Sequence, residues 1–284
     1  MRFKALALLV AAWPLHSAAA ERRLVIHADD LGMSHSVNRA SFEALEKGWV
    51  TSASILVPCP WFPEVARWAR DHPEADLGIH LALNSEWTTL RWGPLSSRDK
   101  VRSLIDEDGY FPLLETAVAQ RARPDEAERE LRAQVERARA AGVPITHLDS
   151  HMAALFGSQA LFGVYRRLAS DYGLPRLVTR RGPRTGFGIT PDAKIDEVLS
   201  HGPEVPASEW RAAYERLLAP LPAGTYQLIV HLGYDDEEMR GATGDHPDWG
   251  AAWRQRDLAV VSSPEFRAFL KREEFELVGW KHLK

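Results

Sequence analysis

Short apolar runs alternate with longer stretches of helical period along most of the chain. Seven runs have the length of buried strands, at residues 23–28, 52–57, 76–81, 145–149, 175–179, 226–231 and 275–279. Between them, apolar residues recur with the spacing of helices, over residues 36–47, 63–71, 125–141, 158–172, 208–218 and 264–271. Such an alternation predicts a parallel sheet covered by helices.

Seven strands in one βα succession favour a single barrel-like domain, over residues 21–284, rather than two doubly wound halves. Three stretches are longer than ordinary connections and are rich in Trp, Arg, Gly and Asp: residues 84–112, 180–190 and 233–249. Long loops of compact α/β domains are often functional. We expect these three to form the walls of a binding site.

Residues 1–20 have the layout of a secretory signal peptide. Arg2 and Lys4 precede an apolar run, and small residues lead up to an expected cleavage after Ala20. The run is far shorter than the roughly 20 residues that a membrane-spanning helix needs. The pattern therefore predicts an exported chain, periplasmic or extracellular, that has no membrane span after cleavage.

Composition narrows the class of protein. Hydrophobic residues make up 45% and charged residues 26% of the 284 residues, a balance typical of a globular protein with a substantial core. Loss of Arg2 and Lys4 takes the formal net charge from −4 to −6, which argues against nucleic-acid binding. Cys59 is the only cysteine, so we expect a buried thiol and no intramolecular disulfide. The oligomeric state stays open, a homodimer included.

Two adjacent carboxylates, Asp29 and Asp30, end the first apolar run in the sequence LVIHADDLG. Side chains alternate along a strand, so both acids reach one pocket only if the strand ends there. We expect a turn assisted by Gly32 to end it. The alternative is that the acids, with Ser34, cap the helix that follows.

Other ionisable residues also lie where apolar runs end. His80 ends the run containing GIHL, and His231 closes the run in YQLIVHLGYDD. In THLDSHM, His147, Asp149 and His151 are spaced by two, which places them on one face of an extended strand. Catalytic groups of barrels gather at the carboxyl ends of the strands, so we expect these side chains to meet.

An aspartate and two histidines are a typical ligand set of a catalytic metal ion, because open positions remain for water and substrate. Asp30, His80 and His151 fit that count and suit zinc by ligand type. Ligating histidines commonly donate their second ring N–H to a carboxylate, and Asp149 is the candidate for this role. His147 receives no role from the pattern.

The motifs ADDLG, GIHL, HLDSHM and VHLGY resemble those of the YdjC-like carbohydrate deacetylases, which include chitooligosaccharide deacetylase. The resemblance implies an irregular seven-stranded (β/α) barrel of the TIM-barrel-like glycoside hydrolase and deacetylase type. It also implies one divalent ion, with magnesium allowed beside zinc, and an acetylated carbohydrate as the substrate. The resemblance implies that Asp30, His80 and His151 are the metal ligands and that Asp29 is the general base. His231 corresponds to a histidine that lies later in the family's sequences.

Two departures from the family pattern affect the pocket rather than the proposed ligands. Met152-Ala153-Ala154 follows His151 where many relatives have further histidines, and Leu232 stands where they have proline after the histidine. Both changes alter the floor and rim of the pocket. The substrates of better-known relatives are therefore not carried over to this chain.

The expected reaction is removal of an acetyl group from an amino sugar by a water that the metal activates. Asp29 would take the proton of the water, and His231 would protonate the departing amine. Five aromatic residues in or beside the loops could stack on sugar rings or serve only as packing: Trp61, Trp87, Trp92, Tyr234 and Trp249.

Two other functions fit part of the pattern. A metal-independent glycoside hydrolase would use two carboxylates, such as Asp29 and Asp236, but would leave His80 and His151 without a task. A non-catalytic carbohydrate-binding protein could retain the barrel and its aromatic loops. The complete set of acids and histidines argues against the non-catalytic binding protein. Sensitivity to a chelator would distinguish a metal-dependent deacetylase from a metal-independent glycoside hydrolase.

Overall fold

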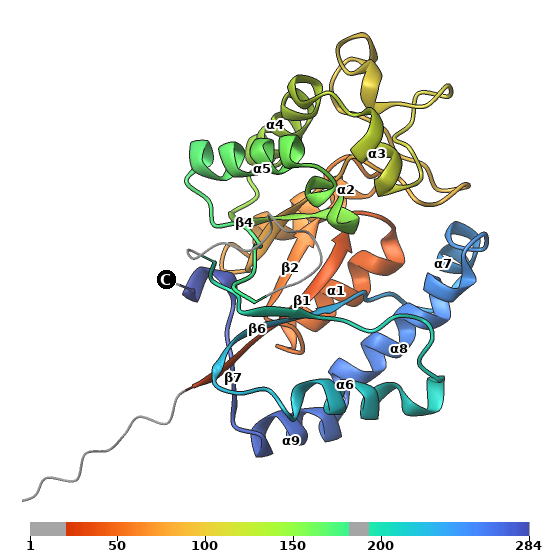
Figure 1. The fold of residues 1–284 in the computed structure, drawn as a ribbon. Coiled ribbons are helices and arrows are strands. Elements are labelled where there is room, and N and C mark those ends of the chain that lie inside the picture. The colour runs from red at the N-terminus through yellow and green to blue at the C-terminus, as the bar shows by residue number, and fades with distance from the viewer. Residues whose placement is uncertain (1–20, 182–192, 284) are drawn as a thin grey trace, which may run out of the picture.

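The computed structural model describes residues 21–181 and 193–283, so the expected signal peptide lies outside the described residues. The strands of one sheet form its centre (Figure 1). They are β1 (Arg22–Leu31), β2 (Ser52–Ile55), β3 (Leu77–Leu81), β4 (Ile145–Ser150), β5 (Glu197–Leu199), β6 (Gly224–Val230) and β7 (Phe275–Leu277).

All seven strands are parallel, in the order β4-β3-β2-β1-β6-β5, with β7 paired to β1. β7 pairs with β1 at residues 22–24, and β2 pairs with it from His27 onward. The α/β class and the parallel sheet are confirmed. The sheet is a curled half-barrel rather than a closed barrel, because β4 and β5 are not paired with each other.

The prediction of a strand at residues 175–179 is wrong. Only isolated bridges occur there, between Leu148 and Arg176 and between Thr179 and Ile195. The segment crosses from the β4 edge of the sheet to the β5 edge and pairs once at each. The segment is half-buried, which accounts for its apolar residues, but an apolar pattern carries no information about how many ladder bonds a segment makes.

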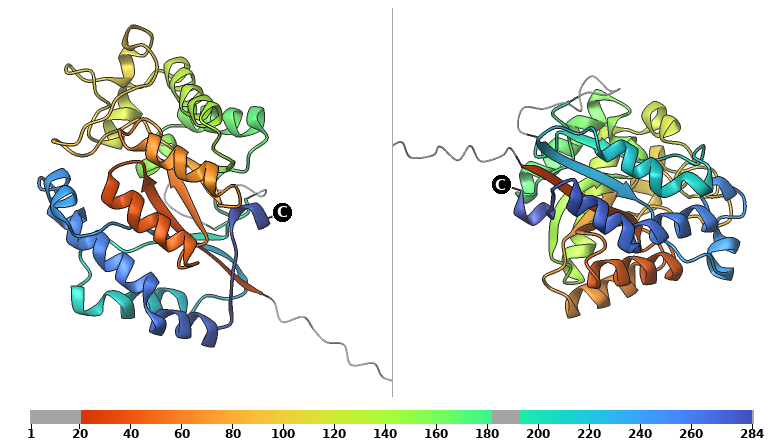
Figure 2. Two further views of the ribbon diagram at one scale, coloured as in Figure 1. Left: turned by 180° about the vertical axis from the view of Figure 1, so that it is seen from behind. Right: turned by 90° about the horizontal axis from the view of Figure 1, so that it is seen from below.

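Helices cover the sheet on both flanks, as the further views in Figure 2 show. Helix α4 packs on β3, helix α1 on β1 and β2, helix α8 on β6 and helix α9 on β7. Among the described residues, no helix has the length and apolarity needed to cross a bilayer. The helices are α1 (His35–Glu46), α2 (Phe62–Asp71), α3 (Glu115–Arg121), α4 (Pro124–Ala140), α5 (Gln159–Tyr172), α6 (Trp210–Leu218), α7 (Glu237–Ala242), α8 (Ala251–Ser262) and α9 (Pro264–Arg272).

All six expected helices are present, and the sequence pattern missed α3, α7 and α8. The amphipathic pattern of α8 is weak because its buried face includes Arg254 and Asp257, whereas its exposed positions include Ala252 and Ala259. Such a helix lacks the one-sided apolar stripe from which helices are recognised. Cys59 is buried and free, as expected.

The long connection at residues 84–112 is fastened to helix α4. Glu130 is fully buried and accepts hydrogen bonds from the backbone N–H groups of Leu95 and Ser96 at 3.1 and 2.9 Å. Gln134, one turn further along α4, both donates to and accepts from the backbone of Ala82. This wall of the cleft is therefore held by buried polar contacts that a loop in solvent would lack.

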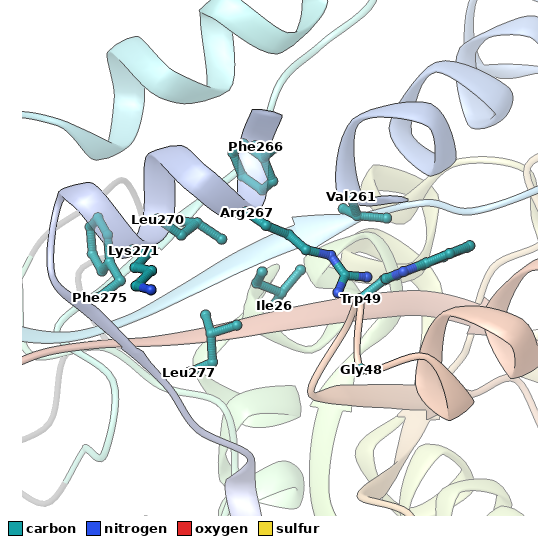
Figure 3. Close-up of a pocket in the computed structure, with 10 residues that line it drawn as sticks. All are labelled: Ile26, Gly48, Trp49, Val261, Phe266, Arg267, Leu270, Lys271, Phe275 and Leu277. Atoms are coloured by element: carbon teal, nitrogen blue, oxygen red, sulfur yellow. The ribbon is translucent and has the colours of Figure 1, made fainter. Parts of the chain in front are cut away.

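A separate hollow of about 280 Å³ lies between α9 and β1 (Figure 3). It is lined by apolar side chains such as Ile26 and Phe266, with Arg267 and Lys271 at its edge. The guanidinium of Arg267 lies 5.9 Å from the ring of Trp49. The described lining contains no acid and no imidazole, so this hollow offers neither a proton acceptor nor a metal ligand.

Inside the sheet, a fully buried layer lies below the carboxyl ends of the strands. His147 stacks on Trp280 with ring centroids 4.8 Å apart and hydrogen-bonds Thr146 through Nδ1. Gly78 on the neighbouring strand makes room for this ring, because a Cβ at Gly78 would lie 2.4 Å from His147 Nε2.

We expect Gly78→Ala to lower the free energy of unfolding by about 1–3 kcal/mol through overpacking against His147. The matched control is Gly241→Ala in helix α7, where an added Cβ meets nothing within 4 Å. That change should be neutral or stabilising, because alanine is the better helix former. Urea denaturation of the three proteins measures both effects, and equal stability of the two variants would contradict the packing argument.

Candidate active site

Asp29 and Asp30 reach the same side of β1 because the strand bulges. Ala28 pairs with Ala53 and Leu31 with Ile55, so two residues of β1 oppose the single Ser54 of β2. Asp30 takes the left-handed conformation, with φ 71°. The expectation that the strand ends at the acid pair is wrong: β1 continues to Leu31, and the bulge rather than a turn re-aims the carboxylates.

The alternative that the acid pair caps helix α1 does not hold. Ser34 is the residue at the cap, and its hydroxyl accepts a hydrogen bond from the backbone N–H of Val37. Both carboxylates are therefore available to the interior of the cleft. Asp30 is 2% exposed and Asp29 is 5% exposed, so each needs buried partners.

One oxygen of Asp30 converges with two imidazole nitrogens. Oδ1 lies 3.6 Å from His80 Nε2 and 3.5 Å from His151 Nδ1. The three ligand atoms lie within 4.8 Å of one another, and Asp30 Oδ1 is buried without a hydrogen-bond partner. Atoms that bind one ion at about 2.1 Å lie roughly 3–3.5 Å apart. The structure therefore brings together the three side chains that the sequence grouped.

The second nitrogen of each imidazole contacts a carboxylate. His80 Nδ1 lies 2.7 Å from Asp149 Oδ1, and His151 Nε2 lies 2.8 Å from Glu86 Oε2. Carboxylate partners of this kind orient the ring of a metal-ligating histidine and fix its tautomer. Asp149 is the partner that the sequence indicated, whereas Glu86 comes from the long loop and was missed.

His151 reaches the site from a turn rather than from the strand. β4 ends at Ser150, and His151 begins a short 3₁₀ turn in which Met152 and Ala153 have φ values of 45° and 55°. His147 is still part of β4 and lies in the buried layer below the site, 5.1 Å from the ring of His27. The spacing by two therefore groups His147 with Asp149, but it does not extend to His151.

His27 connects the two carboxylates that flank the site. Its Nε2 lies 3.1 Å from Asp149 Oδ2 and 3.2 Å from Asp29 Oδ1, and its Nδ1 lies 3.0 Å from Ser52 Oγ. Burial alone would lower the pKa of His27, but the hydrogen bonds to Asp149 and Asp29 raise it to about 9. His27 is therefore a buried imidazolium at neutral pH.

Asp30 is held from the other side by Arg254 of helix α8. Arg254 donates from Nη2 to Asp30 Oδ2 at 2.8 Å, and both side chains are 3% exposed. Burial opposes ionisation of Asp30, but Arg254 and the imidazoles of His151 and His231 hold the pKa of this carboxyl well below its usual range. The salt bridge occupies one oxygen and leaves the other facing the histidines.

The charges around the point where Asp30, His80 and His151 converge favour a divalent cation. The surrounding side chains include four carboxylates, those of Asp29, Asp30, Glu86 and Asp149, but only two cations, those of Arg254 and His27. The excess negative charge overcomes the effect of burial and raises the pKa of His80, and that of His151 to about 10. Protons on these two imidazoles balance the excess negative charge when no ion is bound, and a divalent ion such as Zn²⁺ or Mg²⁺ could replace them.

His231 follows β6 directly and is fixed by helix α8. Its backbone N–H donates to Asp257 Oδ2 at 2.9 Å, and its ring lies 4.8 Å from that of Trp253. Its Nε2 is 4.0 Å from Asp29 Oδ2. Burial lowers the pKa of His231, although Asp29 and Asp30 oppose this effect. Asp257 accepts two further hydrogen bonds, from Trp210 and Tyr214, so its position is well determined.

Two pockets of similar size meet at the site. The apolar pocket has a volume of about 390 Å³ and reaches Asp29 and His80. It is lined by Met152, Phe156, Leu177, Val178, Val198 and Ile229. The tryptophan pocket has a volume of about 400 Å³ and reaches Asp30 and His151. It is lined by Glu86, Trp87, His246, Trp249, Trp253 and Arg254. Met152 and His231 line both pockets.

Two of the three long loops line the tryptophan pocket, as expected. Residues 84–112 contribute Glu86 and Trp87, and residues 233–249 contribute His246 and Trp249 to the tryptophan pocket. The loop at 180–190 falls outside the described residues after position 181.

Three of the aromatic candidates line neither of the two pockets. Trp61 stacks on His35, Tyr234 hydrogen-bonds Glu43, and Trp92 packs beside His151 while donating to the backbone of Asn84.

Four groups that touch the cluster were missed by the sequence analysis: His27, Glu86, Arg254 and Asp257. His27 precedes Asp29 by two residues on the same strand, so strand alternation could have placed it on the same face. The other three come from a long loop and from a helix that the pattern did not predict. Residues on such elements give no periodic signal that relates them to a sheet edge.

A family model described as "YdjC-like protein" matches residues 23–272. The chain belongs to the YdjC-like family. Among its relatives, a carbohydrate deacetylase from Thermus thermophilus is 35% identical over 93% of this chain and 94% of its own length. A carbohydrate deacetylase from Brevibacillus brevis is 38% identical over 92% of this chain and 99% of its own length. The resemblance inferred from the four motifs is confirmed.

A solved structure supports the same fold for this YdjC-like chain. A protein from Enterococcus faecalis, named for cellobiose-phosphate cleavage, superposes with a TM-score of 0.76 at 24% identity. The match covers 93% of this chain and 99% of the other. At this identity the likeness concerns the fold alone.

The protonation of His27 has a consequence for stability. A pKa that is about 9 in the folded chain and 6.5 in the unfolded chain stabilises the fold fully below pH 6.5 and loses this effect as the pH rises through 9. We expect the destabilisation caused by His27→Gln to be largest at low pH and to shrink by about 3 kcal/mol above pH 9. Urea denaturation of both proteins in the same chelator, from pH 5.5 to 10, measures it. Parallel pH curves would contradict a charged His27.

Proposed function

We propose that this protein is a metal-dependent carbohydrate deacetylase that hydrolyses the amide of N-acetylated sugars. The single observation that carries the proposal is the convergence of Asp30 Oδ1, buried without a partner, on His80 Nε2 and His151 Nδ1. Family membership and relatives named as carbohydrate deacetylases support the same class of reaction.

Asp30, His80 and His151 would hold the ion, with Asp149 and Glu86 orienting the two rings. A divalent metal bound there would lower the pKa of a coordinated water and polarise the amide carbonyl. Arg254 keeps Asp30 ionised and turns its Oδ1 toward the histidines. The donor set accepts either zinc or magnesium.

Asp29 is the proposed general base. Its Oδ1 is occupied by Ser54 Oγ and His27 Nε2, both at 3.2 Å, whereas its Oδ2 faces His80 and His231. The free oxygen can accept the proton of the attacking water, and the protonated His27 behind it keeps the carboxylate in place. Such a base typically contributes 10²- to 10⁴-fold to the rate.

His231 is the proposed general acid. Burial favours its neutral form, so the imidazole must first receive a proton before it can donate one. Asp29 Oδ2, 4.0 Å from His231 Nε2, is a nearby source, and distances of this kind commonly shorten when substrate binds. The proton then passes to the amine nitrogen as the C–N bond breaks.

The position of Asp236 gives little support to the alternative of a glycoside hydrolase that uses Asp29 and Asp236 as its two carboxylates. Asp236 caps helix α7 by accepting a hydrogen bond from the backbone N–H of Met239, and it also accepts from Ser36 Oγ at 2.6 Å. Its carboxylate is therefore engaged in structural contacts, and a carboxylate pair of Asp29 with Asp236 is not the arrangement that the site suggests.

The base assignment is tested with Asp29→Asn. We expect the variant to keep its metal while kcat on an N-acetylated chitooligosaccharide falls about 10²- to 10⁴-fold, because the amide cannot take the proton. Acetate release and elemental analysis are measured on the same preparation, before and after chelation. Near-normal turnover in the variant would remove Asp29 as the base, and full activity of the wild type after complete chelation would remove the metal.

The role of Glu86 is tested with Glu86→Gln. The amide retains the size of the carboxylate but is a weaker acceptor for the N–H of His151, so we expect a 10- to 100-fold loss of metal affinity. Glu64→Gln is a matched control, because Glu64 also accepts from a histidine, His35, outside the site. Metal titration followed by calorimetry compares them. Equal affinities in the two variants would show that Glu86 does not support the ligand.

A further inference from the structure

The two pockets that meet at the site differ in chemistry. The tryptophan pocket has the exposed indole of Trp249 together with Glu86 and His246, which can form hydrogen bonds with hydroxyl groups. Beyond the site, the described lining of the apolar pocket consists mainly of Phe156, Leu177, Val178, Val198 and Ile229, with the hydroxyl groups of Ser150, Thr179 and Ser200 beside them. A sugar ring needs both stacking surfaces and hydrogen-bonding partners, so it fits the tryptophan pocket better.

The apolar pocket has a firm floor. Leu177 and Val198, which line it, pack against a small cluster of buried side chains that includes Val25, Ile195 and Trp280. Trp280 is further fixed by a hydrogen bond from its Nε1 to Gln227 at 2.9 Å. A pocket formed by packed core residues is available before a ligand arrives, so little ordering is needed on binding.

The size of the apolar pocket exceeds what an acetyl group requires. Its volume is about 390 Å³, whereas a methyl group occupies roughly the 30 Å³ share of one water molecule. Several methylene groups could be buried there, and each buried methylene contributes up to about fourfold to binding.

The site lies where an amide would join the two pockets. Asp29 and His80 line the apolar pocket, Asp30 and His151 line the tryptophan pocket, and His231 lines both. An amide whose nitrogen is near His231 can extend its sugar into one pocket and its acyl carbons into the other. Met152, with its left-handed backbone, lies at the junction.

We propose that the apolar pocket binds the acyl chain, and that the enzyme removes N-acyl groups longer than acetyl, from butyryl to about hexanoyl, from amino sugars. The inference rests on the proposed deacetylase function and specifies its substrate class. Water adds to the carbonyl carbon, the C–N bond breaks, and the nitrogen takes a proton. The products are the free amino sugar and a short-chain carboxylate, with no change of oxidation state.

The test uses the full mature protein with its metal and three glucosamine disaccharides, carrying N-acetyl, N-butyryl or N-hexanoyl groups. We expect kcat/KM for the hexanoyl substrate to equal or exceed that for the acetyl substrate. Val198→Phe fills the pocket, so the ratio of hexanoyl to acetyl kcat/KM should fall at least tenfold. Trp249→Ala, on the tryptophan pocket, is the control: both substrates should be affected equally, which leaves the ratio as in the wild type.

A second measurement does not depend on the folding of any variant. Hexanoate should inhibit the wild-type protein at a concentration at least tenfold lower than acetate does, because only the longer product fills the apolar pocket. The inference is overturned if acetyl is removed but butyryl and hexanoyl react more than 100-fold more slowly, or if Val198→Phe leaves the ratio unchanged. Failure to release any acyl group from the three substrates would instead overturn the proposed function itself.

Discussion

The bulge in β1 between Ala28 and Leu31 is the constraint on which the site depends. In a regular strand Asp29 and Asp30 would face opposite sides of the sheet, and only one of them could reach the cleft. The extra residue, with Asp30 at φ 71°, turns both carboxylates toward His80. A left-handed aspartate costs about 1–2 kcal/mol, which the surrounding packing and the salt bridge to Arg254 must offset.

Asp29 and Asp30 each have one oxygen tied to a cation of the protein, and this leaves the second oxygen of each for the proposed chemistry. Arg254 holds Asp30 Oδ2, and His27 holds Asp29 Oδ1. Helix α8 contributes twice, because Arg254 and Asp257 are three residues apart and so lie on one face, where one contacts Asp30 and the other the backbone of His231. The helix thus sets the position of a proposed ligand and of the proposed acid together.

Below the site, the histidines have a different role. His27 and His147 fill the interior of the curled sheet, and their partners are Asp149 of β4 and Asp76, which directly precedes β3. Burial lowers the pKa of His147, whereas the two carboxylates beside His27 raise its pKa to about 9. Two imidazoles 5.1 Å apart therefore avoid mutual repulsion, because only one of them carries a charge.

The sequence by itself determined the parallel α/β class, six of the helices, and the grouping of Asp30, His80 and His151, because strand exits on a parallel sheet share one edge and their residues can be read from local patterns. It also indicated Asp149 as a partner. Only the tertiary structure decided that the sheet stays open, that a bulge aims the acid pair, and that Glu86 and Arg254 complete the cluster. These features depend on contacts between residues up to 224 positions apart, for which short-range periodicity carries no signal.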